Sequence, residues 1–439
     1  MTLWPSRLLL GFLAAWTAAA ALLVLLPAAW PVAMGTLVAL LGAAIWDALL
    51  LRARVPLALD RMLPARAFVG QPAWLEIRLE SRDGVHADVF EELPVDVAAE
   101  EPRFDGVIVP AREALILRYA VHPLQRGDRE LGRLVGFERS PLGLLRRRVF
   151  SPAAALLRVY PDTTRFLRPA SLDPRRVLAE LGVRPARKRG DGTEFESLRD
   201  YSPGDDPRRI DWAASARRGR PVVRLQRHER SNIVLVAIDA SRLMGARSGA
   251  RTKLDYAIDA ALALIYASLT SGDRVGLAVF DRKLRAHLAP RSRREAFGAF
   301  VEALRTVQPR MLEADHTGLV RELAILQRHR ALVVVLTDFV EAESARLAEP
   351  FAVLGKRHRV LLVAVRDPIF ALLDPGHAAA DESGLGLYRR LALDDLLHER
   401  EWALAALRRR GVETLDLAPE AITAPLLNRY LALRYGPER

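Results

Sequence analysis

Two long apolar runs stand near the start of the chain. Residues 8–26 are uncharged and mostly apolar, and residues 32–51 carry a single charge, Asp47. Each run matches the roughly 20 residues that an α-helix needs to cross a bilayer core. A Pro-Ala-Ala-Trp-Pro turn separates them, and the first run lacks a convincing cleavage motif, which argues against a signal peptide. We therefore expect residues 1–54 to form a two-span transmembrane hairpin.

Basic residues flank this hairpin at both outer ends. Arg7 precedes the first span, and Arg52 and Arg54 follow the second. Positively charged flanks stay on the cytoplasmic side of a membrane. The sequence thus predicts a multi-pass protein of the inner (cytoplasmic) membrane, with both termini and the soluble domains in the cytoplasm.

The pattern changes to short β-strands over residues 55–160. Residues 73–80 and 115–121 alternate between apolar and polar side chains, as half-buried strands do. A Ser-Arg-Asp-Gly turn signal at 81–84 follows the first of them. We expect a small antiparallel β-sandwich here. It contains no catalytic constellation, so a binding or spacer role is the default interpretation.

A polar, arginine-rich segment follows at residues 161–230. Residues 184–192 resemble a basic linker, but residues 194–212 interleave aromatic side chains with opposite charges and turn residues. This second pattern predicts a folded loop that arginine–carboxylate pairs hold in place.

Strand and helix patterns alternate over residues 231–439. Residues 232–238 are a continuous apolar run, typical of a strand in a buried parallel sheet, and residues 252–270 carry an apolar stripe at helical spacing. Further strands are expected at 274–280, 331–337, 359–365 and 413–417, with helices at 293–306, 317–328, 341–357, 394–410 and 419–433. This alternation predicts a doubly wound α/β domain, with an irregular insertion at 367–390.

The composition excludes several classes of chemistry. The 439 residues include no cysteine, which rules out disulfides, thiol catalysis, cysteine-ligated zinc and iron–sulfur clusters. The net charge of +12 suits nucleic acid or anionic lipid. The arginines are scattered through every domain, however, so no specific nucleic-acid binding is expected. The sequence also lacks a P-loop, a His-Glu-x-x-His motif and a Gly-x-Ser-x-Gly elbow.

Oxygen-bearing side chains follow two of the predicted parallel strands. Asp239 and Ser241 come directly after one strand, Asp338 follows another, and Thr317 opens a helix. Ligands of open α/β sheets bind at the carboxyl ends of the strands, and hard oxygen ligands suit Mg²⁺ or Mn²⁺. Acidic residues at strand ends also serve as loop and helix-cap residues, so this pattern alone leaves both interpretations open.

The same residues resemble the von Willebrand factor A fold. The Asp239-x-Ser241 pair, Thr317-Gly318 and Asp338 are similar to its metal-ion-dependent adhesion site, whose pattern is Asp-x-Ser-x-Ser, then Thr, then Asp. Leu243 stands here where that pattern has its second Ser. The resemblance therefore implies a degenerate site with weak or absent Mg²⁺ binding, which Leu243→Ser should strengthen.

A longer resemblance lies upstream. The motifs Gly-Thr-Glu-Phe at 192–195, Leu-Arg-x-Tyr at 198–201 and Pro-Gly-Asp-Asp-x-Arg-x-Ile-Asp-Trp at 203–212 are similar to the signature of a membrane family, domain-of-unknown-function family fifty-eight. The motif Ser-Pro-Leu-Gly-Leu at 140–144 resembles its β-rich region. The family has no settled biochemical activity. The resemblance implies an adaptor for a MoxR-type AAA+ ATPase and for other membrane proteins with von Willebrand A domains.

The signature supplies the second set of candidate residues. They are Arg199, Tyr201, Gly204, Asp205, Asp206, Arg208, Ile210, Asp211 and Trp212. Their acids are poor candidates for catalysis, because pairing with arginine lowers the pKa of a carboxyl group. We expect Ile210 and Trp212 to be buried against the α/β domain in a structural role. The alternative is partner recognition, which requires an exposed Trp212.

We therefore expect a non-enzymatic, membrane-anchored adaptor. One rival is a metal-assisted hydrolase at the strand ends, for which His316 is the nearest candidate base in the sequence. The distance between His316 and the strand-end acids distinguishes the two. The other rival is an arginine-mediated binder of nucleic acid or anionic lipid.

Overall fold

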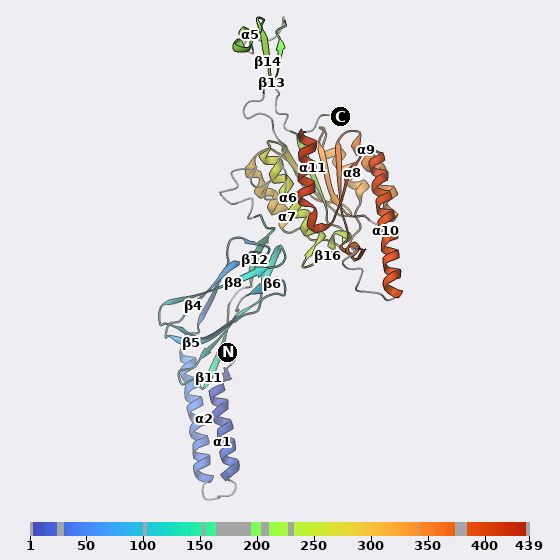
Figure 1. Ribbon diagram of the computed structural model, residues 1–439. Coiled ribbons are helices and arrows are strands. Elements are labelled where there is room, and N and C mark those ends of the chain that lie inside the picture. Colours follow the sequence, from blue (N-terminus) through green and yellow to red (C-terminus); the bar gives the residue numbers. More distant parts are fainter. Residues whose placement is uncertain are drawn as a thin grey trace. The chain divides into compact units, whose positions relative to one another are not determined.

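The computed structural model describes residues 3–23, 30–99, 103–151, 154–163, 195–202, 210–226, 232–339, 341–373 and 384–435. The chain divides into two compact units, Met1–Thr163 and Thr164–Arg439, and each is described by itself (Figure 1).

The first unit contains two helices and twelve described strands. The helices are α1 (Arg7–Leu23) and α2 (Trp30–Ala53). The strands are β1 (Leu3–Pro5), β2 (Ala58–Met62), β3 (Ala67–Phe68), β4 (Ala73–Glu80), β5 (Val85–Glu91), β6 (Val97–Ala99), β7 (Arg103–Val109), β8 (Ala114–Pro123), β9 (Gly127–Leu131), β10 (Leu134–Arg139), β11 (Leu145–Phe150) and β12 (Ala155–Tyr160).

These strands form three sheets around one core. Their orders are β1-β11-β10-β5-β7, β2-β4-β8-β6 and β3-β12-β9, and the paired strands are antiparallel except β3 with β12. Inward-facing side chains from all three sheets, such as Ile77, Val89 and Leu157, belong to a single buried cluster. The predicted β-rich character of this region is confirmed.

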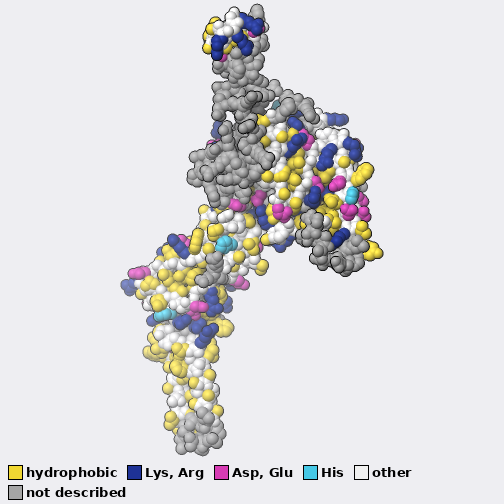
Figure 2. Space-filling view, in the orientation of Figure 1, with side chains coloured by type: hydrophobic (Ala, Val, Ile, Leu, Met, Phe, Trp, Pro, Cys, Tyr) yellow, Lys and Arg dark blue, Asp and Glu magenta, His cyan; other side chains and the backbone are white. Residues whose placement is uncertain are grey.

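The helices α1 and α2 lie side by side (Figure 1). The indole Nε1 of Trp16 donates a hydrogen bond to the carbonyl oxygen of Ala33 over 3.0 Å. Hydrophobic side chains cover much of the outer surface of these helices (Figure 2). Among the described helices, α2 is long and apolar enough to cross a membrane, and α1 is apolar but shorter. By length and composition, such a helix fits a membrane anchor or a signal sequence.

The one charge in the second apolar run is fully buried against the β-sheets. The carboxylate of Asp47 accepts hydrogen bonds from the backbone N–H groups of Leu142 (2.9 Å) and Leu144 (3.1 Å), and from the hydroxyl of Ser140. The motif at 140–144 is the turn between β10 and β11. Asp47 therefore attaches α2 to this turn, and its charge is satisfied by protein donors.

A buried arginine donates hydrogen bonds to carbonyl oxygens at the C-terminal end of α2. The guanidinium of Arg147 on β11 donates to the carbonyl oxygens of Leu51 and Arg54, both over 3.0 Å. It also pairs with the carboxylate of Glu138 at 2.7 Å, and both side chains are almost fully buried. The last carbonyls of a helix have no partner within the helix, and they carry partial negative charge. Arg147 thus satisfies these carbonyls and fixes the helix to the sheet.

The second unit contains a small hairpin module and an α/β domain. The module comprises β13 (Phe195–Asp200), α5 (Trp212–Arg218) and β14 (Val222–Gln226). The strands of the α/β domain are β15 (Ile233–Asp239), β16 (Arg247–Ser248), β17 (Arg251–Thr252), β18 (Arg274–Phe280), β19 (Leu284–Arg291), β20 (Leu332–Thr337), β21 (Arg359–Val365) and β22 (Glu413–Leu417). Its helices are η4 (Arg242–Gly245), α6 (Lys253–Thr270), η5 (Arg294–Ala296), α7 (Phe297–Arg305), α8 (His316–Leu326), α9 (Glu341–Gly355), η6 (Pro368–Leu373), α10 (Gly384–Arg409), η7 (Pro419–Ala421) and α11 (Thr423–Tyr435).

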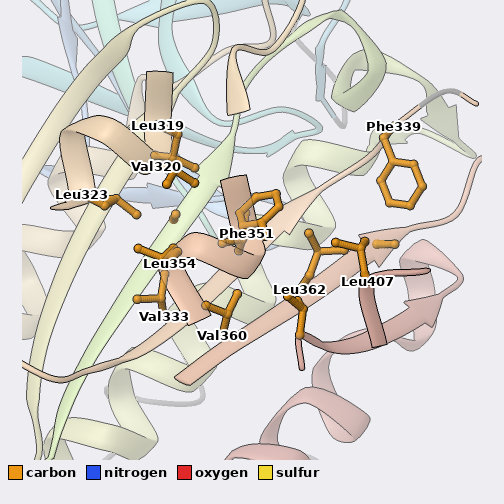
Figure 3. Packing of buried hydrophobic residues seen from close by; sticks show 14 of the residues in the cluster. Leu319, Val320, Leu323, Val333, Phe339, Phe351, Leu354, Val360, Leu362 and Leu407 are labelled. Atoms are coloured by element: carbon orange, nitrogen blue, oxygen red, sulfur yellow. The ribbon is translucent and has the colours of Figure 1, made fainter. Parts of the chain in front are cut away.

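Six of these strands form one mixed sheet in the order β19-β18-β15-β20-β21-β22. Neighbours are parallel except β18 with β19. Helices cover both faces of the sheet, with α6, α7 and α11 on one side and α8, α9 and α10 on the other (Figure 1). On the second side, Leu319 and Leu323 of α8 pack with Phe351 of α9 and with Val333 of β20 (Figure 3).

The predicted strands agree with the structure, and two other segments differ. The antiparallel edge strand β19 was not expected, because its sequence Leu-Arg-Ala-His-Leu-Ala-Pro-Arg is polar and contains proline. The segment 367–390, expected to be an irregular insertion, contains η6 and the start of α10, which begins at Gly384 and not at residue 394. The first residues of this helix are Gly-Leu-Gly, and because glycine has a low helix propensity the sequence pattern did not predict a helix there.

We predict that Arg147→Met destabilises the first unit by about 3–5 kcal/mol, because it leaves the buried Glu138 carboxylate and the carbonyl oxygens of Leu51 and Arg54 without their partner. Arg118→Met is the matched control, since Arg118 pairs with Glu76 while 67% of its own side chain is exposed. An exposed pair contributes about 0–1 kcal/mol. Denaturant unfolding of the full chain in detergent measures both variants, and equal losses would contradict the capping role of Arg147.

Candidate functional site

Three parallel strands end in aspartates at the same edge of the six-stranded sheet. Asp239 is the last residue of β15, Asp281 follows β18, and Asp338 follows β20. All three are buried, with at most 4% of their surface exposed. The topology therefore brings Asp239 and Asp338 to one edge, as the sequence predicted, and adds Asp281.

Asp239 is held by donors on both carboxylate oxygens. The backbone N–H of Ser241 donates to Oδ1 and the hydroxyl of Thr337 donates to Oδ2, each over 2.7 Å. Burial raises the pKa of Asp239 to about 6, although these hydrogen bonds oppose the shift by favouring the charged form. Asp239 is therefore a fully enclosed carboxyl group, and its neighbours fix its orientation.

His316 completes this network from the first turn of α8. Its Nε2 lies 2.9 Å from the hydroxyl oxygen of Thr337. Since that hydroxyl donates to Asp239, the ring nitrogen is the donor in this contact. The imidazole also makes edge contacts with the rings of Phe280 and Phe351. Burial lowers the pKa of His316 to about 4, so the ring is neutral at physiological pH.

Two cations neutralise Asp338. The ammonium of Lys253, at the start of α6, contacts its Oδ2, and the guanidinium of Arg400, on α10, lies 2.6 Å from its Oδ1. Lys253 also lies 3.4 Å from Asp367, and Arg400 lies 3.0 Å from Asp416. The Lys253 side chain is fully buried, which requires paired carboxylates nearby. Asp338 is therefore the centre of an ion network that joins α6, α10 and β22.

The other predicted strand-end residues lie at different depths. Ser241 is buried beside Asp239, whereas Thr317 is exposed on α8. Within the described residues, α8 joins the hydrogen-bond network of Asp239 through His316 and not through Thr317. Leu243 is half-buried within η4. Within the described ranges, no group of three or more His, Asp or Glu side chains is placed to hold a metal ion.

Sequence reasoning missed Lys253, Thr337 and Arg400. Lys253 follows the helix cap Thr252, and the helix it begins carries an apolar stripe. This position gave only weak evidence in the sequence that the lysine is buried. Arg400 lies 62 residues beyond Asp338 in the chain, and nothing in the pattern of α10 distinguishes it from its neighbours. Both pairings depend on the tertiary fold.

The signature forms the hairpin module. Asp211 caps α5 by accepting a hydrogen bond from the backbone N–H of Ala214 over 3.1 Å, and Ser215 links α5 to Val222 of β14 over 3.0 Å. The backbone of Tyr201 bonds to Pro221, and Ile210 forms a bridge with Val223. Gly204, Asp205, Asp206, Arg208 and the side chain of Arg199 lie outside the described residues.

The expected burial of Trp212 is wrong. Its side chain is 69% exposed, and that of Ile210 is half-buried. Trp212 is the first residue of α5, and the face that packs on β14 carries the buried Ala214 and Ser215 instead. This exposure is the state that the partner-recognition alternative requires.

Residues 197–384 match the model of the family described as Protein of unknown function DUF58. This match confirms the family resemblance that was based on the signature motifs. The chain is 27% identical over 234 residues to the uncharacterized proteins Mb1516 of Mycobacterium bovis and Rv1480 of Mycobacterium tuberculosis, covering 53% of this chain and 72% of each relative.

Comparison with solved structures gives a more distant similarity. The conserved hypothetical protein BatB of Bacteroides thetaiotaomicron is 15% identical, with a TM-score of 0.32, over 47% of this chain and 100% of that one. The C-terminal part of α-2-macroglobulin from Escherichia coli is 13% identical, with a TM-score of 0.21, over 25% of this chain and 17% of that one.

We predict that Asp239→Asn and His316→Gln change the pH dependence of stability in opposite directions. The raised pKa of Asp239 makes its contribution to folding present below pH 4 and lost as the pH rises toward 6. The lowered pKa of His316 makes its contribution present above pH 6.5 and lost as the pH falls toward 4. Relative to wild type, Asp239→Asn should gain about 2–3 kcal/mol with rising pH, and His316→Gln a similar amount with falling pH.

Unfolding of the full chain at several pH values between 4 and 6.5 measures both slopes. Asp394→Asn is the control, because 56% of its side chain is exposed. Variant curves that run parallel to the wild-type curve would contradict the assigned burial of the two groups.

Proposed function

We propose that this chain is a non-enzymatic, membrane-anchored adaptor that docks onto a protein partner through the exposed Trp212 of its signature module. A MoxR-type AAA+ ATPase, together with other membrane proteins that carry von Willebrand A domains, is the partner that the family resemblance implies. The observation that carries the proposal is the 69% exposure of Trp212 on a module that other signature residues hold in place.

The module presents Trp212 in a fixed position. Asp211 caps the helix immediately before it, and Ser215 ties the next turn to β14. Because Trp is large and loses little conformational freedom on binding, it is enriched among residues that dominate binding energies. Arg217 and Arg218 occupy the last turn of the same helix, so a partner surface with an apolar pocket and acidic rim fits best.

The strand-end network supports a non-catalytic role. A general base must reach a proton of the substrate, whereas His316 is buried, neutral and packed between two aromatic rings. It reaches Asp239 only through the hydroxyl of Thr337. His316 therefore lies near Asp239, but the enclosure of both side chains favours a structural function over the metal-assisted hydrolase.

The sheet order favours a von Willebrand A-like, doubly wound domain. The first strand of the domain, β15, lies in the middle, and the chain order continues outward in both directions as β19-β18-β15-β20-β21-β22. In open sheets of this kind, ligands bind at the carboxyl edge where the strand order reverses. In this proposal, the edge near Asp239 is a second surface that faces partners.

The anchor in this proposal is the two-span hairpin α1–α2, with both termini in the cytoplasm. The pairing of β1 with β11 supports it, because the segment before α1 and the segment after α2 then share one sheet. Arg7 and Arg52 flank the outer ends of the hairpin, as the positive-inside rule requires of cytoplasmic ends.

We predict that Trp212→Ala leaves the melting temperature within about 2 °C of wild type, since little buried surface is lost. It should reduce the recovery of the AAA+ ATPase, co-purified from native membranes and quantified by mass spectrometry, by at least about tenfold. Trp402→Ala is the matched control, because Trp402 on α10 is also 69% exposed. Unchanged capture by Trp212→Ala would overturn the proposal, and a large drop in melting temperature would restore the structural interpretation.

Single cysteines test the topology, because the natural chain has none. We predict that Ala28→Cys, between the two spans, reacts with a membrane-impermeant maleimide added to cells with a permeabilised outer membrane. Val95→Cys, at a fully exposed position of the β-sheet unit, should react only after lysis. The reverse pattern would place the soluble domains on the other side of the membrane.

A further inference from the structure

The carboxyl edge of the six-stranded sheet does not fit the divalent metal that a von Willebrand A-like site implies. We propose that the Lys253 ammonium is the built-in cation of this edge and makes a divalent ion unnecessary there. The inference concerns the site itself and does not rest on the adaptor role.

The position of Lys253 is fixed by the fold. It is the first residue of α6, directly after the cap Thr252, and its backbone N–H donates to Ala246 over 2.9 Å. Its side chain is fully buried, with the ammonium against Asp338 and 3.4 Å from Asp367. A metal ion at a strand end joins the acidic residue after one strand to the loop after another. Lys253 makes the same connection with a side chain of the protein: it belongs to the segment that follows β15, and its ammonium forms an ion pair with Asp338 after β20.

Both oxygens of Asp338 are already engaged. Oδ2 contacts Lys253, and Oδ1 accepts hydrogen bonds from Arg400 (2.6 Å) and from the backbone N–H of Phe339 (2.8 Å). A divalent ion would have to displace a buried cation from this carboxylate. A displaced Lys253 would keep only the carboxylate of Asp367, 3.4 Å away, and a displaced Arg400 only that of Asp416, 3.0 Å away. The loss of one carboxylate partner by a buried cation is unfavourable.

The charges of the network are balanced without a metal. Three carboxylates meet three cations: Asp338, Asp367 and Asp416 with Lys253, Arg366 and Arg400. An added divalent cation would give this network, in which Lys253, Asp338 and Arg400 are buried, an excess of positive charge. The affinity of a site for hard cations depends on the number of anionic oxygens that remain available. The carboxylates of Asp338, Asp367 and Asp416 are already paired with cations, and the carboxylate of Asp239, outside this network, accepts two hydrogen bonds.

The remaining ligands of the expected pattern do not replace Asp338. The two oxygens of Asp239 accept hydrogen bonds from Ser241 and Thr337. Leu243 offers no oxygen, and Thr317 is exposed. The missing serine is therefore a secondary defect, and the internal cation is the main obstacle to metal binding. This predicts that Leu243→Ser alone does not create a metal site.

The test uses the purified full chain in detergent with Mn²⁺ as the probe, which electron paramagnetic resonance detects directly. Wild type and Leu243→Ser should bind no Mn²⁺ saturably up to about 1 mM, and their melting temperatures should be the same in Mn²⁺ and in EDTA. Lys253→Met should lower the melting temperature by at least about 5 °C. Lys283→Met, at an exposed lysine of the same domain, should leave it unchanged.

The double variant Lys253→Ser with Leu243→Ser removes the cation and restores the oxygen ligand. Its melting temperature should rise in Mn²⁺ relative to EDTA, because only the folded state binds the ion. Lys253→Arg keeps the positive charge, so this variant should fold, and its melting temperature should be the same in Mn²⁺ and in EDTA. It provides a result even if the variants with a neutral residue at position 253 do not fold. Saturable Mn²⁺ binding by wild type or by Leu243→Ser, or a Lys253→Met variant as stable as Lys283→Met, would overturn the inference.

Discussion

The guanidinium of Arg147 is the contact on which the first unit depends. It lies on β11, pairs with Glu138 of the neighbouring strand, and reaches the last carbonyls of α2. A buried guanidinium needs a carboxylate and several further acceptors, and this position supplies all of them. Any rotation of α2 against the sheet would break these bonds together. Arg147 therefore sets the orientation of the β-sheets relative to the apolar helices, together with Asp47, which attaches α2 to the turn between β10 and β11.

The α/β domain uses the same principle at the carboxyl edge of its sheet. Lys253 and Arg400 hold Asp338 much as Arg147 holds Glu138, with buried cations matched to buried carboxylates. Such networks tolerate the loss of one member poorly, because each remaining charge would be left unpaired in a low dielectric. They favour a single fixed geometry over adaptability.

The sequence predicted what depends on local pattern and missed what depends on pairing across the fold. The runs that became β15, β18 and β21 are rich in Val, Ile and Leu, so their burial follows from composition. Asp239 and Asp338 could be found because a strand end in the sequence is also an edge in space. Lys253 and Arg400 could not, since each meets its carboxylate from a distant helix. Trp212 was misjudged for a related reason: aromatic residues are commonly buried, but the first position of a short helix can face away from its strand.

The strand β1 has a consequence for how the protein is made. Leu3–Pro5 leaves the ribosome well before its pairing partner β11, which follows more than a hundred residues later, after both apolar helices and most of the sheets. Domains generally fold as the chain leaves the ribosome, starting from the N-terminal part. Here β1 stays unpaired beside the two helices until β11 has formed. The edge strand β1 of the five-stranded sheet can pair only after β11 has been made, so this sheet is complete only when the chain before α1 and the chain after α2 have come together.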